Sequence, residues 1–256
     1  MDGWKAHLEL EHPCWTGYRV AIGRLRDGPF PAAEDLNGLL LPGQANAAGH
    51  RLKFRAAAEL PGVDYEKHIY ETGEVSTREE SWHDLFNALA WCRFPRLKAA
   101  LNECHYRHLH EARDGRRGAQ RDALTLLDES GVIVTSPDRG LLDALWARDW
   151  QAAFVARRDS WAASGVMVCG HAILEKFLNP YKALTAHALL LPLDGAACAA
   201  DLDAELAKRL RAGELLQTTR DLSPLPLMGI PGWWPGGPQD ASFYADRTVF
   251  RQPRSV

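Results

Sequence analysis

The chain has 256 residues, 46% of them hydrophobic and 25% charged, so it can bury a substantial core as one domain. Its net charge of −3 gives no overall field that would attract nucleic acid. The five cysteines are widely spaced without a CxxC pair, which argues against a disulfide framework or a zinc ribbon. Because there is no signal sequence and no apolar run of bilayer length, we expect a cytoplasmic protein with reduced thiols and no membrane contact.

The pattern of elements predicts a helix-rich α+β domain with short β-hairpins. Residues 1–30 are rich in Gly and Pro and are expected to be irregular, and residues 31–220 to form the core. Within the core, acidic residues in the first turn and Pro42-Gly43 at the end predict a short helix from about Ala32 to Leu41. The tail, 221–256, is rich in Pro, Gly and aromatic residues, and we expect it to pack on the core as a clamp, with stacking on a ligand as the alternative.

The histidine-rich stretch 65–110 carries the first group of candidate site residues. Alternation around Thr72-Gly73 predicts a β-hairpin or a strand followed by a tight loop within 65–77. A helix then follows, capped by Thr77 or Ser81 and ended or interrupted by Pro95. Polar residues at the edge of its buried face are well placed for chemistry, and equally well placed to bond a neighbouring loop; the candidates are His83, Asp84 and Asn87.

The segment 93–121 is the most basic part of the chain, with eight basic and three acidic residues. It begins with a second helix, whose apolar stripe includes His108 with His105 beside it. A basic helix face can hold an anionic substrate or nucleic acid, but solvated helix faces are often charged for no such reason. The residues of this candidate patch are Arg93, Arg96, Lys98, Arg107, Arg113, Arg116 and Arg117.

The run 121–136 is predicted to be a second hairpin, with its turn at 128–131. Asp128 and Gly131 are then explained by turn chemistry alone. Arg121 and Asp122 precede the first strand and have no such explanation, so they are candidates for orienting catalytic groups. The following segment, 138–163, has the apolar periodicity of one amphipathic helix or two.

A second group of candidates follows the short apolar strand 166–169. Gly170 leads into a helix that begins at His171 and ends before Pro180. A histidine in the first turn of a helix is kept neutral by the helix dipole, and the neutral imidazole binds metal or accepts a proton. Glu175 lies one turn further on, and His187 follows the break, so these three side chains could converge. The predicted metal ligands are His171, Glu175, His187 and His105.

No strong catalytic signature supports these groups, since HExxH, paired CxxC and nucleophile-elbow motifs are all absent, as is any nucleotide-cofactor motif. A single buried histidine more often has a structural role than a catalytic one. The argument for a site depends on their number, because several imidazoles on or beside apolar faces without a shared purpose are uncommon. They are His83, His105, His108, His171 and His187.

Four motifs taken together closely resemble a bacterial family of unknown function, domain of unknown function 3025. They are TREESWHDLFNALAWCRFPRLKAALN, RDALTLLDESGV, GHAILEKFLNPYKALTAHAL and LPLMGIPGWW, and the resemblance extends from about 36 to 250. It implies a single-domain cytoplasmic bacterial protein and supplies no activity. Locally, a hairpin followed by a helix with His83 and Asn87 is somewhat similar to HNH (His-Me finger) endonucleases, which would make His83 the general base. The usual first-strand histidine of that motif has only His68 as a loose counterpart.

The function that we expect is metal-assisted hydrolysis of an anionic, phosphate-containing substrate, with Zn²⁺, Mn²⁺ or Mg²⁺ as the ion. His83 or His171 would act as base or ligand, and Arg121 or the basic segment would hold the substrate charge. One alternative is an HNH-like nuclease. Another is a non-enzymatic module that binds RNA or a protein through the basic segment and does not need the histidines.

Overall fold

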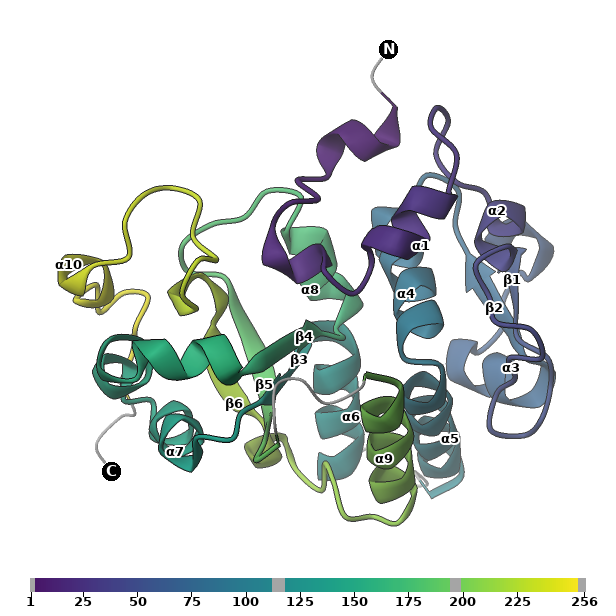
Figure 1. The fold of residues 1–256 in the computed structure, drawn as a ribbon. Coiled ribbons are helices and arrows are strands. Elements are labelled where there is room, and N and C mark those ends of the chain that lie inside the picture. Colours follow the sequence, from purple (N-terminus) through teal and green to yellow (C-terminus); the bar gives the residue numbers. More distant parts are fainter. Residues whose placement is uncertain (1–2, 112–117, 194–198, 253–256) are drawn as a thin grey trace.

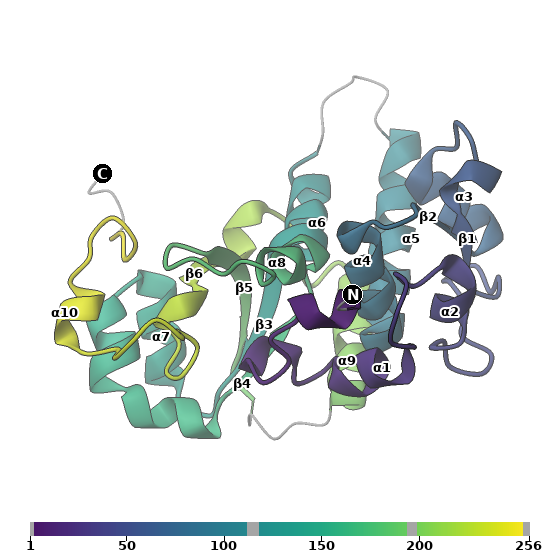
Figure 2. The same ribbon diagram turned by 90° about the horizontal axis from the view of Figure 1, so that it is seen from above.

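A computed structural model describes residues 3–111, 118–193 and 199–252. Over these residues the chain is a helix-rich α+β fold with one four-stranded and one two-stranded sheet, which confirms the predicted class (Figure 1). The larger sheet and the C-terminal tail lie at one end of the molecule, the two-stranded sheet lies at the other, and a group of helices stands between them (Figures 1 and 2).

The larger sheet has the strand order β4-β3-β5-β6. Its central strands, β3 (Gly131–Thr135) and β5 (Thr185–Leu191), are parallel, while the edge strands β4 (Gly165–Val168) and β6 (Ser223–Pro226) run antiparallel to their neighbours. All five residues of β3 are buried, as expected for a continuous apolar run at the centre of a covered sheet. The edge strand β6 contains two prolines, which only an edge tolerates.

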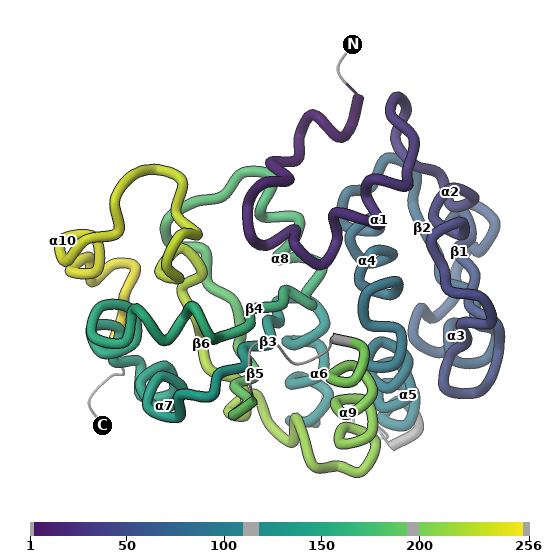
Figure 3. The backbone as a smooth tube through the Cα atoms, in the orientation of Figure 1, coloured from purple at the N-terminus to yellow at the C-terminus, as the bar shows by residue number. Residues whose placement is uncertain are grey.

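The central helices are α4 (Trp82–Arg93), α5 (Pro95–Glu111), α6 (Ala119–Ser130), α8 (His171–Lys176) and α9 (Ala199–Arg211). Their packing partners are α4 with α8, α6 with α8, and α5 with both α6 and α9, which the backbone trace also shows (Figure 3). Ser81 caps α4 as predicted, since its hydroxyl accepts from the Asp84 N–H. Asp203 of α9 caps α5 by accepting from the N–H groups of Arg96 and Leu97 at 3.0 and 2.9 Å.

The hairpin predicted within 65–77 is wrong. Residues Tyr65–Thr72 form helix α3, which connects two parallel strands, β1 (Lys53–Ala56) and β2 (Glu74–Thr77). Gly73 has a φ of 79° and ends the helix, with its N–H bonded to the carbonyl of Ile69. A glycine in the left-handed conformation closes helices as well as hairpins, so the pattern alone did not distinguish the two.

The hairpin predicted within 121–136 is also wrong, because α6 continues to Ser130 and leads directly into β3. The apolar residues Ala123, Leu124 and Leu127 are buried on one face of this helix at helical spacing. The predicted turn at 128–131 is therefore the last turn of α6 and the start of β3. Asp128 and Glu129 therefore lie at the end of a helix, whereas the predicted hairpin would have placed them in a turn.

The N-terminal segment contains two 3-10 turns (Trp4–His7 and Pro13–Trp15) and helix α1 (Arg19–Arg24), so it is less irregular than predicted. It packs where the helices meet the sheet: the Tyr18 hydroxyl donates to the carbonyl of Val168 at 2.6 Å. Helix α2 (Ala33–Asn37) is shorter than the predicted helix Ala32–Leu41.

The tail packs against the segment between α7 (Arg139–Ala147) and β4. That segment consists of a π-helical turn (Ala152–Ala156) and a 3-10 helix (Arg158–Ala163) in place of a second α-helix. Phe154 stacks on Tyr244 of α10 (Ala241–Tyr244), with ring centroids 5.5 Å apart, and contacts Phe250 at 6.0 Å. Short 3-10 turns, Ala57–Glu59, Thr219–Asp221 and Leu227–Gly229, complete the described elements.

Four of the cysteines lie in the described residues, and all four carry free thiols, as expected: Cys14, Cys92, Cys104 and Cys169. Cys198 lies outside the described residues. Within the described part of the chain, no helix has both the length and the apolar character needed to cross a bilayer.

Candidate functional site

Three helix ends meet beside the larger sheet and bring together side chains that are far apart in the sequence. They are the first turn of α4, the last turn of α6 and the first turn of α8. The approach of α8 to α6 requires Gly170, because a Cβ there would lie 2.3 Å from the backbone nitrogen of Gly131 and 2.6 Å from the carbonyl oxygen of Glu129. This close backbone contact places His171 next to Glu129.

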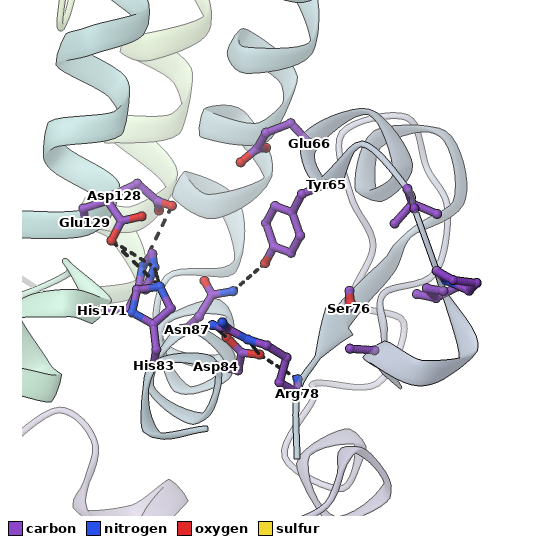
Figure 4. A pocket seen from close by; sticks show the side chains of 15 residues that line it. Tyr65, Glu66, Ser76, Arg78, His83, Asp84, Asn87, Asp128, Glu129 and His171 are labelled. Atoms are coloured by element: carbon purple, nitrogen blue, oxygen red, sulfur yellow. Dashed lines mark hydrogen bonds and ion pairs between the residues drawn. The ribbon is translucent and has the colours of Figure 1, made fainter. Parts of the chain in front are cut away.

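His83, His171 and Glu129 form a compact cluster at this junction (Figure 4). The Nε2 atoms of His83 and His171 are 3.0 Å apart, and the Oε2 atom of Glu129 lies 3.4 Å from Nε2 of His171 and 4.0 Å from Nε2 of His83. Two ligands of a tetrahedral zinc ion are about 3.3 Å apart, given bond lengths of about 2.0–2.2 Å. The three donor atoms are thus spaced as ligands of one ion are, and His171 is buried while the other two are half-buried.

A carboxylate lies behind the Nδ1 atom of each imidazole of the cluster. Nδ1 of His83 lies 3.1 Å from Oε2 of Glu175, and because a carboxylate only accepts, Nδ1 carries the proton and Nε2 presents its lone pair. Nδ1 of His171 is buried and faces Oδ2 of Asp128 at 3.9 Å. A cation at Nε2 of His171 would place the proton on Nδ1, beside that carboxylate, so the residues present fit a bound metal ion.

Burial sets the protonation of this cluster. It lowers the pKa of His171 to about 4, so the imidazole is neutral at physiological pH, which is the form that ligates metals. Burial and the nearby Asp128 raise the pKa of Glu129. For Asp128 burial acts in the same upward direction, but the Lys98 ammonium and the nearby His171 outweigh it, and its pKa is lowered. Asp128 is therefore an anion next to a neutral imidazole.

Behind the cluster lies a chain of buried polar contacts that begins at Asp128. Its Oδ1 atom is 2.5 Å from the Nζ atom of Lys98, whose side chain is 7% exposed. The same ammonium donates to Oδ1 of Asn87 at 2.9 Å, and Nδ2 of Asn87 donates to the hydroxyl oxygen of Tyr65 at 2.6 Å. The predicted catalytic residue Asn87 is thus held between a cation and a phenol.

A cavity of about 470 Å³ opens in front of the cluster and is lined by His83, His171, Glu129 and Tyr65 (Figure 4). Part of its wall is the loop after β1, at residues 57–63, which contributes mostly apolar groups. The remaining lining residues are polar: Glu66, Ser76, Arg78, Asp84, Asn87 and Asp128.

Two carboxyl groups in the cavity wall, those of Asp84 and Glu66, have pKa values shifted in opposite directions. The Arg78 guanidinium pairs with Asp84 through two contacts of 2.8 and 3.0 Å and lowers the pKa of that carboxyl below its usual value, against the effect of burial. Burial raises the pKa of Glu66 to about 7, and Asp128 adds to this effect. Glu66 accepts a hydrogen bond from Asn102 at 2.7 Å. It is the cavity carboxyl whose protonation changes near neutral pH.

The structure brings some of the predicted site residues together and leaves others apart. His83 and His171 share the cluster, Glu175 bonds to His83, and Asp84 and Asn87 line the cavity. His187 lines a different cavity with Trp146, Arg148 and Arg220, although its backbone on β5 lies between Gly131 of β3 and Pro224 of β6.

Three further predicted residues do not line the cavity. His105 is buried on α5, where desolvation lowers its pKa to about 4. Arg121 and Asp122 lie in the first turn of α6, about 10 Å or more along the helix from Glu129 at its other end.

Residues that the sequence did not single out complete the site. Glu129, the third donor of the cluster, lies on α6, as does Asp128, and both were assigned to a hairpin turn. Tyr65 and Glu66 lie in the first turn of α3, which was read as a strand. Helical spacing of Leu124 and Leu127 was the signal that could have placed Asp128 and Glu129 at a helix end.

The basic side chains of the segment 93–121 have different surroundings over the described residues, and Arg96 is exposed. Lys98 is buried against Asp128, and Arg107 pairs with Glu103 on the same helix. The side chain of Arg93 packs against Gly17. Arg113, Arg116 and Arg117 lie outside the described residues.

The likeness to HNH endonucleases depended on a hairpin before α4. Residues 65–72 are helical, and β2 pairs with β1 in parallel, so that hairpin is not present. His68 lies on α3, where its Nε2 atom is 3.4 Å from Glu74, and it does not line the cavity.

Comparison with known proteins identifies the family and no activity. Neither the curated proteins nor the solved structures contain a match to this chain. A family model described as "Protein of unknown function (DUF3025)" matches residues 52–254, which include all the residues of the cluster and its cavity. The chain belongs to the DUF3025 family.

Proposed function

We propose that the protein is a metal-assisted hydrolase whose ion is held by His83, His171 and Glu129. The observation that carries the proposal is the spacing of the three donor atoms, at most 4.0 Å apart, at the wall of a cavity. Two imidazoles and one carboxylate are a donor set of catalytic zinc sites, in which a fourth position remains for water or substrate. Imidazole donors favour Zn²⁺ or another transition ion over Mg²⁺, which prefers oxygen ligands.

The charge of the cavity supports a bound cation. Four carboxylates line it (Glu66, Asp84, Asp128 and Glu129), and Glu175 lies behind His83. Arg78 neutralises Asp84, and Lys98 neutralises Asp128. Glu129 and Glu175 form ion-pair contacts only with His83 and His171 among the described residues, so a divalent ion beside them would supply positive charge to the site.

The chemistry of a hydrolase follows from these groups. A bound ion would lower the pKa of its water and polarise an oxygen atom of the substrate. Glu175 would hold the tautomer of His83, and Glu66, with a pKa of about 7, would give or take a proton within the cavity. For the anionic, phosphate-containing substrate expected from the sequence, Arg78 is the cavity cation in place of Arg121 and the basic segment.

Metal analysis tests the proposal directly. The purified chain, stripped with a chelator and reloaded, should retain about one equivalent of Zn²⁺ by mass spectrometry. His83→Ala and Glu129→Gln should lose the ion while remaining folded by circular dichroism, and His187→Ala, in the other cavity, should retain it. No retained ion in the wild type, or equal retention in all variants, would refute the site.

Activity is the second measurement. The loaded protein should hydrolyse one of three chromogenic classes, a phosphate monoester, a phosphate diester or a carboxylic ester, and Glu129→Gln should lose that activity. Retention of the ion with no turnover in any class would indicate a structural metal instead of a catalytic one.

A further inference from the structure

The hydrogen bonds around Tyr65 determine which way its hydroxyl hydrogen points. Lys98 can only donate, so the Asn87 atom at 2.9 Å from its ammonium is the amide oxygen. The NH₂ group of Asn87 then faces Tyr65, 2.6 Å away, and donates to the phenol oxygen. Because Asn87 supplies the hydrogen of this contact, the hydrogen of the Tyr65 hydroxyl is available to another acceptor.

None of the described residues accepts this hydrogen, and the hydroxyl is open to the cavity. Tyr65 lines it, and Figure 4 shows its hydroxyl directed to the same side as Asn87, toward the helix that carries His83. Asn87 follows His83 by one helical turn on α4, and side chains at this spacing are about 5–6 Å apart. A substrate that is held at the cluster and extends about one helical turn along α4 would therefore meet the phenol. Burial raises the pKa of Tyr65 well above its usual value, so the hydroxyl keeps its hydrogen.

The amide of Asn87 is itself held firmly. Lys98 is fixed by the buried pair with Asp128, and both side chains are mostly buried, at 7% and 16% exposure. Turning the Asn87 amide over would place its NH₂ against the Lys98 ammonium, which has no acceptor for it. The buried pair of Lys98 and Asp128 therefore fixes the Asn87 amide so that its NH₂ group donates to the Tyr65 oxygen.

We propose that Tyr65 donates a hydrogen bond to an oxygen atom of the substrate held at the candidate metal site, and that Asn87 and Lys98 fix this donation. The inference rests on the proposed function and adds the group that would stabilise negative charge on that oxygen. It defines the substrate class as one whose scissile centre bears a phosphoryl or carbonyl oxygen. The neighbouring part of the substrate would contact the mostly apolar loop 57–63.

Inorganic phosphate, a tetrahedral oxyanion, is the probe. Its binding to the zinc-loaded full chain is measured by calorimetry for the wild type, Tyr65→Phe and Asn87→Asp. Loss of one hydrogen bond to a charged acceptor weakens binding about 10- to 100-fold, so we expect that loss in Tyr65→Phe. Asn87→Asp should show a similar loss, because a carboxylate in place of the NH₂ group accepts the phenol hydrogen. The double variant should be no weaker than either single one.

Tyr70→Phe is the matched control, since it removes a phenol hydroxyl from the same helix, outside the cavity. It should bind phosphate as the wild type does, and all variants should retain one equivalent of Zn²⁺. With the ion retained, phosphate affinity of Tyr65→Phe within twofold of the wild type, or no phosphate binding by the wild type, overturns the role of Tyr65. Full affinity in Asn87→Asp overturns the positioning role. Failure of the wild type to retain zinc overturns the proposed function as well, and is distinct from these results.

Discussion

Two regions of the molecule bury different kinds of side chain, charged and imidazole groups around the cavity and aromatic rings around the tail. Around the cavity, buried charges and imidazoles are paired with one another: Lys98 with Asp128, and His171 with Glu129. Around the tail, Phe154, Tyr244 and Phe250 bury aromatic area against each other. Aromatic burial contributes directly to the free energy of unfolding, whereas buried ion pairs contribute little net stability because desolvation offsets their attraction. We therefore expect substitutions in the tail to lower the free energy of unfolding, and we expect the charges of the cavity to matter mainly for the proposed function.

The largest expected effect is in the tail. Phe154→Ala removes a ring that is fully buried and contacts four other aromatic rings, those of Trp150, Trp161, Tyr244 and Phe250. We therefore expect a loss of about 3–5 kcal/mol in the free energy of unfolding. Urea titration followed by fluorescence measures it. Val155→Ala, at an exposed neighbouring position, should cost less than about 1 kcal/mol. A comparable loss in both variants would contradict the assignment of Phe154 to the core of this cluster.

Removing one partner of the buried ion pair should also destabilise, for a different reason. Lys98→Met leaves the Asp128 carboxylate buried and unpaired, which costs about 3 kcal/mol or more. The double variant Lys98→Met/Asp128→Asn, with no buried charge, should recover most of that loss. If the double variant is as unstable as Lys98→Met, the loss comes from packing of the Lys98 side chain and not from an unpaired charge.

Glu66 makes the stability of the cavity region depend on pH. Its pKa is about 7 in the folded protein, and an unfolded glutamate titrates near 4.3, so the folded state binds the proton more tightly. The stability that this group contributes is fully present below about pH 4.3 and is lost as the pH rises through about 7. Compared with Glu66→Gln, the wild type should lose up to about 3 kcal/mol between pH 4.5 and pH 8 in urea titrations. Parallel pH profiles for the two proteins would refute this.

The smallest effect is expected at Glu175, which contacts His83 and is not one of the three proposed metal ligands. Glu175→Gln keeps a hydrogen-bond acceptor but removes its charge, so we expect Zn²⁺ affinity to fall by about 10-fold, with unfolding in the metal-free state unchanged. Competition with a chromogenic chelator measures the affinity. Glu205→Gln, on the exposed face of α9, is the control and should not change it.

The sequence correctly predicted those helices whose flanking residues mark a helix start and nothing else. Ser81 before α4 and Gly170 before His171 both mark helix starts, and both were located correctly. Gly73 did not determine the element before it, because a left-handed glycine closes helices and hairpins alike. The same holds for the candidate site, where His83 and His171 lie on helices that were predicted correctly. Glu129 was missed because its helix was taken for a hairpin, and His187 was misplaced because strand direction requires the sheet order.

The contact of Gly170 with Gly131 and Glu129 sets the spacing of the proposed metal site. Two backbones meet there with no room for a methyl group, so the separation of α6 from α8 is fixed by the main chain and not by the ligands. Exchanging one donor side chain for another would change which ion is preferred but leave that separation intact. Gly170→Ala would do the opposite, keeping every ligand and moving His171 away from Glu129. If the proposed site binds an ion, its selectivity for an ion of a given size would therefore depend on Gly170, a residue that contributes no ligand.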